Sequence, residues 1–275
     1  MKKYVQFLVA LLILGSGHMT AQDNQQCLQN LSIFAENAKV KNYIAAYEPW
    51  LAVKTECPSL NVAIYSYGER ILKDRLKNAT AADKAAVQGD LLALYDDWIK
   101  YFPTKRGKNK VGDILSSKAQ NMIDFKIGSA EEIYATFDEA YTKDAASFTN
   151  PKRLYNYFKT FYDLYKSGKG SITTAMLFDK YEEISEKFEV EGTSLAKKLD
   201  VILKKEESGA ALSTKDLKRR RIYDVNSNAI GVFLKNLDAI IAKESSCENL
   251  VPLYQSSFEE NKTNPVWLNR AAGRM

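Results

Sequence analysis

The chain has very little histidine: of 275 residues only His18 is one, and it lies in an N-terminal segment that we expect to be removed. A mature chain without histidine has no imidazole base for a catalytic triad and no imidazole ligand for zinc or iron. Strong charge of one sign is also missing, because the formal net charge is only +5 and falls further when Lys2 and Lys3 leave. We therefore expect neither histidine-based catalysis nor nucleic-acid binding.

Proline and glycine are scarce, with 6 and 13 residues, as expected when turns are few. Apolar residues recur with helical periodicity nearly throughout, and no segment alternates convincingly as a strand. Ser129 with Glu132 forms a capping box, and Asn150 before Pro151 is a typical helix start. We predict an all-α chain with helices near 27–39, 42–56, 59–78, 81–102, 109–125, 129–145, 151–167, 172–188, 192–206, 213–243, 247–260 and 265 onward.

The first 22 residues predict a secretory signal peptide. Lys2 and Lys3 precede an apolar run of eleven residues, Tyr4 to Leu14, and small and polar residues follow. The alternative, a transmembrane anchor, needs about 20 apolar residues. We expect cleavage after Ala21 or Gln22, and no stable membrane insertion of the product.

A repeat frame of about 34 residues, starting at Cys27, organises the next stretch. In this frame Ala46 falls at position 20, Trp50 at 24 and Pro58 at 32. The tetratricopeptide repeat prefers alanine, a large aromatic residue and proline at these places.

The second frame starts at Asn61 and places Ile64, Tyr67, Gly68 and Ile71 on the motif of the first repeat helix. Glycine inside a helix costs about 1 kcal/mol against alanine, so close helix packing must compensate. We therefore expect Gly68 where the first helix of a repeat lies against its second.

The stretch NYIAAYEPWLAVKTECPSLNVAIYSYGERIL resembles tetratricopeptide-repeat proteins, specifically the exported, degenerate ones of Gram-negative envelopes. YNYFKTFYDLYKSGKG is similar to further hairpins of that group. The resemblance implies antiparallel helical hairpins stacked as an α-solenoid. We divide the chain into a signal peptide (1–22), tetratricopeptide-like hairpins (23–104), further helical repeats (105–263) and the start of a helix (264–275), which we interpret as cut short.

The frame also predicts a disulfide. Cys27 and Cys57 occupy the two open ends of one antiparallel hairpin and should be neighbours. By loop-entropy arithmetic this bridge would contribute about 3 to 4 kcal/mol to the free energy of unfolding. Cys247 is left without an assigned partner.

Two sets of residues are candidate binding positions. In RLYNYFKTFYDLY, one helical stripe holds Leu154, Phe158, Phe161 and Tyr165, which are expected in the core. Tyr155 and Tyr162 on the neighbouring stripe either join that core or line a concave groove for a peptide or sugar. In the second frame, Tyr65 and Arg70 are turned away from the packing positions and are further candidate groove contacts.

Basic clusters occur at 105–110 (KRGKNK) and 215–224 (KDLKRRRIYD), the second including Arg219, Arg220 and Arg221. In the second cluster Asp216 and Asp224 are four residues from Arg220, a spacing at which the charges on a solvated face neutralise each other. The alternative is a patch that attracts acidic glycans or lipid head groups.

Carboxylates come as adjacent pairs, such as Asp96 with Asp97, whose side chains point in different directions on a helix, so no acid/base dyad is predicted. We predict no enzyme, no metal and no cofactor. The expected function is a non-catalytic scaffold in the periplasm or at the cell surface of a Gram-negative bacterium, binding an envelope protein or peptide segment. The alternative is a structural binder of anionic envelope polysaccharide.

Overall fold

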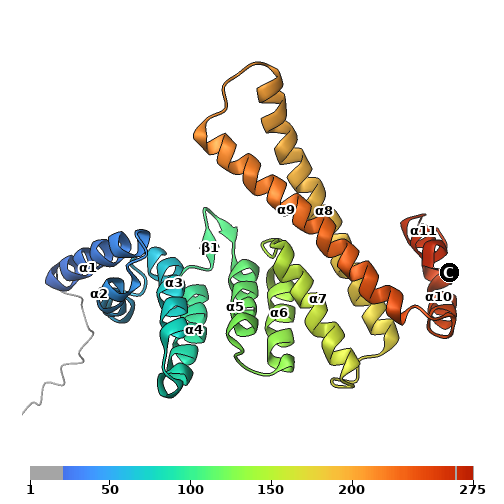
Figure 1. Cartoon of the computed structure of the whole chain (residues 1–275), viewed down its shortest axis with the longest axis horizontal. Coiled ribbons are helices and arrows are strands. Elements are labelled where there is room, and N and C mark those ends of the chain that lie inside the picture. The colour runs from blue at the N-terminus through green and yellow to red at the C-terminus, as the bar shows by residue number, and fades with distance from the viewer. Residues whose placement is uncertain (1–20, 264, 275) are drawn as a thin grey trace, which may run out of the picture. The chain divides into compact units, whose positions relative to one another are not determined.

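The computed structural model describes residues 21–263 and 265–274 and is all-α apart from one small two-stranded sheet (Figure 1). The chain forms two compact units, Met1–Thr80 and Ala81–Met275, and within each the helices pack in adjacent pairs. This confirms the predicted all-α class. The predicted signal peptide lies almost entirely outside the described residues.

The first unit contains α1 (Ala21–Lys39), α2 (Tyr43–Glu56) and α3 (Ala63–Asn78). The side chain of Asn42 accepts a hydrogen bond from the Ala45 amide and caps α2. α1 and α2 form the closest pair of the unit, and α3 packs against both. Pro49 lies inside α2, which runs on through it.

Gly68 is closely packed, as the sequence predicts, but its partner is Trp50 of α2, the helix before it, and not the second helix of its own repeat. A Cβ atom built on Gly68 would come within 2.6 Å of the Trp50 indole nitrogen. The fully buried Trp50 ring therefore fills the space that a side chain at 68 would need, and its Nε1 donates a hydrogen bond of 2.7 Å to the Ile64 carbonyl. α2 and α3 are joined by an aromatic ring seated directly on glycine.

The predicted disulfide is present in the first unit. The sulfurs of Cys27 and Cys57 lie 1.94 Å apart, and their Cα atoms are separated by 6.3 Å. Both side chains are buried. Cys247, in the second unit, is free and exposed.

The second unit begins with α4 (Ala81–Tyr101), so its boundary falls before this helix and not at 104/105. Its remaining elements are β1 (Thr104–Lys105), β2 (Lys108–Asn109), α5 (Val111–Phe125), α6 (Ala130–Asp144), α7 (Pro151–Lys166), α8 (Thr174–Glu207), α9 (Thr214–Glu244), α10 (Cys247–Asn261) and α11 (Pro265–Arg274).

The core of this unit is a run of buried aromatic and aliphatic side chains carried by α5 to α10, with Ala271 of α11. Leu154, Phe158 and Phe161 on α7 belong to it, as the helical stripe predicts. The predicted helix starts are confirmed: Ser129 and Glu132 form a capping box, and the Asn150 side chain caps α7 ahead of Pro151.

Two elements differ from the prediction. The helices predicted at 172–188 and 192–206 are one helix, α8, because it packs along α9 for much of its length and a 2.8 Å Lys187–Glu191 ion pair crosses the expected break. The segment expected as a loop after Pro103 is a β-hairpin, since Arg106 and Gly107 both adopt positive φ and form its two-residue turn.

Within the part of the chain that the structure describes, no helix combines the length and hydropathy that a membrane span requires.

Candidate functional site

α5 and α7 meet through a polar seam, made of Asp113, Ser116, Ser117 and Gln120 on α5 with Arg153 and Asn156 on α7. The guanidinium of Arg153 is the centre of this seam. Its Nη1 lies 2.6 Å from the Asp113 carbonyl, 2.8 Å from the Ser116 hydroxyl and 2.7 Å from the Ser117 hydroxyl. Its Nη2 lies 2.9 Å from the Asp113 carboxylate, and only 16% of the Arg153 side chain is exposed.

The seam continues along both helices by side-chain amides. Asn156 Nδ2 donates to Gln120 Oε1 at 2.6 Å, and Gln120 Nε2 donates to Asp124 Oδ1 at 2.8 Å. Lys152 of α7 reaches the same carboxylate at 3.5 Å. The row of donors and acceptors therefore covers about three turns of α5 and little more than one turn of α7.

A hollow of about 410 Å³ opens beside this seam, between α5, the start of α6 and α7. Apolar side chains from α5 and α6 and polar side chains from α7 share its lining: Met122, Ile123, Ala130 and Ile133, with Asn156, Lys159, Thr160 and Asp163; Lys126 and Gly128 complete it. Lys159 and Asp163 form an ion pair with each other. The hollow offers an apolar surface with polar groups beside it, the usual composition of a ligand pocket.

A second polar network, which the sequence analysis did not identify, ties α6, α7 and α8 together. Tyr134 and Tyr157 both donate hydrogen bonds to the Asp138 carboxylate, and Lys180 donates to the Tyr157 hydroxyl at 2.8 Å and to Glu183 at 2.6 Å. Burial, and then the neighbouring carboxylate, raises the pKa of both phenols well above their usual value. Both tyrosines therefore stay neutral and act as hydrogen-bond donors, not as nucleophiles.

Tyr155 and Tyr162 contact α9. The Tyr155 ring stacks on Phe233 at a centroid distance of 4.9 Å, and the Tyr162 hydroxyl donates to Glu244 at 2.7 Å. Both rings are half-buried. The structure therefore favours the first of the two sequence readings, in which these tyrosines pack between helices.

The two candidate groove residues in α3, Tyr65 and Arg70, differ in their exposure to solvent. The expectation that Tyr65 turns away from the packing positions is wrong: its ring is fully buried, and its hydroxyl donates to the Pro58 carbonyl at 2.9 Å. A tyrosine at that position fills the bottom of the α2–α3 turn, because the chain reverses there at Pro58. Arg70 is exposed, and its guanidinium lies 5.3 Å from the centre of the Tyr67 ring.

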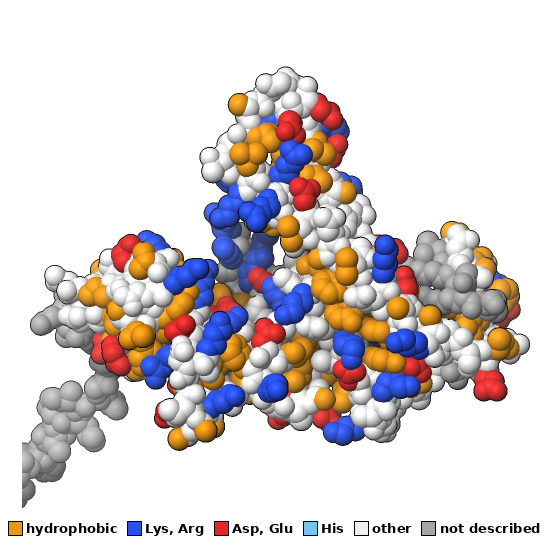
Figure 2. Space-filling model, in the orientation of Figure 1, with side chains coloured by type: hydrophobic (Ala, Val, Ile, Leu, Met, Phe, Trp, Pro, Cys, Tyr) orange, Lys and Arg blue, Asp and Glu red, His pale blue; other side chains and the backbone are white. Residues whose placement is uncertain are grey.

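The basic cluster of α9 is neutralised differently from the prediction. Asp216 pairs with Lys205 at 2.8 Å and Arg220 with Glu206 at 2.7 Å, so both partners come from α8 and not from α9 itself. The hydrogen bond from Lys205 lowers the pKa of Asp216 to about 2. Arg219 and Arg221 are exposed. In Figure 2, Lys and Arg side chains gather between the tip of the β-hairpin and the first turns of α9.

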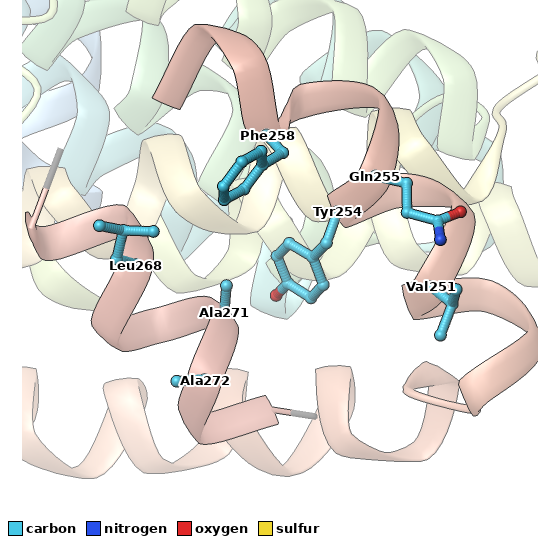
Figure 3. A pocket seen from close by; sticks show the side chains of 7 residues that line it. All are labelled: Val251, Tyr254, Gln255, Phe258, Leu268, Ala271 and Ala272. Atoms are coloured by element: carbon cyan, nitrogen blue, oxygen red, sulfur yellow. The ribbon is translucent and has the colours of Figure 1, made fainter. Parts of the chain in front are cut away.

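A second hollow, of about 420 Å³, lies between α10 and α11. In Figure 3, Tyr254 and Phe258 of α10 point toward Leu268 and Ala271 of α11. Its lining is almost entirely apolar, with Gln255 the clearest polar group. It offers few groups that would orient a ligand, and the hollow beside the polar seam is therefore the stronger candidate site.

The seam residues were missed because each is a common polar residue. Their spacing is the signal that could have found them: Arg153, Asn156 and Thr160 lie three and four residues apart, and so form a polar stripe beside the aromatic stripes of α7. Gln120 and Asp124 continue a matching stripe on α5.

In residues 21–263 and 265–274, no three histidine, cysteine, aspartate or glutamate side chains gather as a metal site would require. Comparison with known proteins finds no protein family, no curated protein and no solved structure that matches this chain.

Proposed function

We propose that the protein is a non-catalytic helical-repeat scaffold that holds a peptide segment of another protein along the polar seam of α5 and α7. One apolar side chain of that peptide would occupy the adjoining hollow. The observation that carries the proposal is the position of this hollow of about 410 Å³, whose apolar lining adjoins the hydrogen-bonding side chains of Asn156 and Thr160. A peptide backbone and one anchoring side chain need this combination.

The polar groups of the seam favour binding over catalysis. Hydrogen bonds to Ser116 and Ser117 orient Arg153, and Asn156 donates to Gln120, so these side chains form a fixed row of polar groups instead of converging on one reacting atom. The expected mature chain also has no histidine to act as a base.

Export to the periplasm or cell surface of a Gram-negative bacterium is part of the same proposal. The Cys27–Cys57 pair supports it, because disulfides persist in oxidising compartments. Membership among exported tetratricopeptide-repeat proteins is also a proposal. The contact of Gly68 with Trp50, and the packing of α3 against both α1 and α2, support it.

A selection from a random peptide library on the disulfide-bonded chain tests the binding proposal. The selected peptides should share one apolar anchor residue. Ala130→Trp places an indole in the hollow and should weaken their binding about tenfold or more, the value of one buried apolar side chain.

The matched control is Ala135→Trp, because Ala135 is also exposed on α6 but does not line the hollow. Equal binding by the two variants would show that the peptides attach elsewhere and would contradict the proposal. Cleavage or chemical change of a bound peptide would overturn its non-catalytic part.

A further inference from the structure

The first half of α9 projects beyond the contacts that hold its second half. Phe233 and Glu244, in the second half, contact α7. In the first half, the ion pairs of Asp216 and Arg220 both go to α8. Figure 1 shows α8 and α9 as a long hairpin extending away from α5 to α7.

From Leu217 to Val232, α9 carries exposed aliphatic side chains on one side. Leu217 is 53% exposed, Ile222 46%, Val225 59% and Val232 56%. At about 100° per residue, these four side chains fall within a sector of roughly 140° of the helix. Lys218 and Arg221 fall within the same sector, and these six residues form what we call the basic–aliphatic face.

Both charged side chains of the basic–aliphatic face, Lys218 and Arg221, are positive. Lys218 and Arg221 are exposed, and neither has an ion-pair partner among the residues that the structure describes. The carboxylates of α9 lie outside the sector: Asp216 bonds to Lys205, Asp238 accepts from Tyr181 and Glu244 accepts from Tyr162, while Asp224 lies beyond the sector's edge. A partner for this face must therefore be anionic.

The exposed aliphatic side chains decide which anionic partner fits. A charged polysaccharide would pair with Lys218 and Arg221 but would leave the four aliphatic side chains in water. A bilayer interface accommodates both kinds, because aliphatic groups enter the boundary of head groups and acyl chains while cations meet lipid phosphates. The face spans about 22 Å of one straight helix, at 1.5 Å per residue, and presents a convex surface that suits a flat partner. Figure 2 shows apolar side chains exposed among charged side chains of both signs on this hairpin.

We propose that the α8–α9 hairpin docks the protein on the surface of an anionic lipid bilayer through the basic–aliphatic face of α9. The docking is peripheral: the helix lies on the interface and does not cross it. This role is separate from peptide binding at the α5–α7 seam and goes beyond it.

Vesicle flotation of the full disulfide-bonded chain tests this proposal. Vesicles of phosphatidylglycerol and phosphatidylcholine in equal amounts should carry the protein, and vesicles of phosphatidylcholine alone should not. Lys218→Gln with Arg221→Gln should lower the partition coefficient on the order of thirtyfold, from the usual contribution of each cation near an anionic surface. Ile222→Ser with Val225→Ser should lower it by a similar factor.

Matched controls lie on the exposed side of α8 in the same hairpin. Lys197→Gln with Lys198→Gln removes the same charge, and Val190→Ser with Val201→Ser removes similar aliphatic area, so both should leave binding nearly unchanged. All these positions are exposed, and circular dichroism will verify that each variant keeps its helices.

Three results would overturn the proposal. The first is that the protein does not bind the anionic vesicles. The second is that the α8 and α9 variants lose vesicle binding equally. The third is that the charge variant of α9 loses vesicle binding and the serine variant of α9 does not. The last result would instead identify a site for soluble polyanions. Ala130→Trp should float like the unmodified protein, so a failure of the peptide proposal and a failure of this one are distinguishable.

Discussion

In the first unit α2 and α3 meet through an indole ring seated on glycine, whereas in the second unit α5 and α7 meet through a guanidinium set among hydroxyls. The Trp50–Gly68 joint is dry and leaves no room even for a methyl group. The seam around Arg153 is polar, and part of it stays accessible at its edge. Both contacts hold two packed helices in register, successive ones at Trp50 and ones that are separated by α6 in the chain at Arg153.

The difference has a functional consequence. A dry joint is stabilised by area and shape, so all of its atoms are committed to the fold. A polar seam fixes the helices while keeping donors and acceptors near the surface, where a ligand can reach them. This is why we propose the binding site at the seam and not at the Trp50–Gly68 joint.

Trp50→Ala is the change expected to weaken the joint most. It removes a fully buried indole and leaves Gly68 facing a cavity, which should lower the free energy of unfolding by about 3 to 5 kcal/mol. Urea unfolding followed by circular dichroism measures this loss. A loss below about 1 kcal/mol would show that the ring does not hold α2 and α3 together.

Arg153→Met is the corresponding change in the seam and should have a smaller effect. Methionine keeps much of the packing volume but leaves the Ser116 and Ser117 hydroxyls and the Asp113 carboxylate without their shared partner. We expect a loss of about 1.5 to 3 kcal/mol, as for hydrogen bonds to a charged group. Arg153→Lys is the control: it keeps the charge but not the planar fork, and should restore only part of the stability. If Arg153→Lys unfolds with the same free energy as the unmodified protein, the positive charge alone stabilises the seam and the planar guanidinium is not needed.

Gly68→Ala and Gly89→Ala should have effects of opposite sign. Both glycines lie inside helices, where alanine is favoured by about 1 kcal/mol. At Gly68 the added methyl group meets the Trp50 ring at 2.6 Å, and overpacking of about 1 to 3 kcal/mol offsets that gain. At Gly89 it meets nothing within 4 Å, so the gain remains. Thermal unfolding of the two variants compares them directly, and stabilisation at both positions would contradict the close joint.

The same contrast explains what the sequence could predict. Close packing at Gly68 was readable because glycine inside a helix is costly, but Trp50 of α2 was not predicted as its partner. The 34-residue frame also placed Cys27 and Cys57 at the two open ends of one hairpin. The helix starts at Ser129 and Asn150 were readable because capping is local chemistry. Tyr65 was misplaced because a single frame position does not say which side of α3 the chain reversal at Pro58 will cover.

The seam and the length of α8 depend on contacts between distant segments. Arg153 and Ser116 are ordinary residues until the fold brings them within 2.8 Å. Residues 189–191 were expected to separate two helices, but α8 is continuous there and through Gly192, because its packing along α9 outweighs the cost of one glycine. Local propensity therefore predicts where a helix starts better than it predicts which other helices will contact it.

The smallest expected effect is alkaline destabilisation of the second unit. Burial, and then the charges of Glu183 and Glu186, raise the pKa of Tyr141 from 10.0 to about 12. Between these values the unfolded chain loses the phenol proton while the folded chain keeps it, so this tyrosine's contribution to stability is complete below pH 10 and is lost as the pH rises toward 12. The Trp50–Gly68 joint contains no titratable group and should not respond. Tyr141→Phe should therefore reduce the slope of unfolding free energy against pH in this window and leave a constant difference below it. An unchanged slope would show that Tyr141 ionises equally in both states.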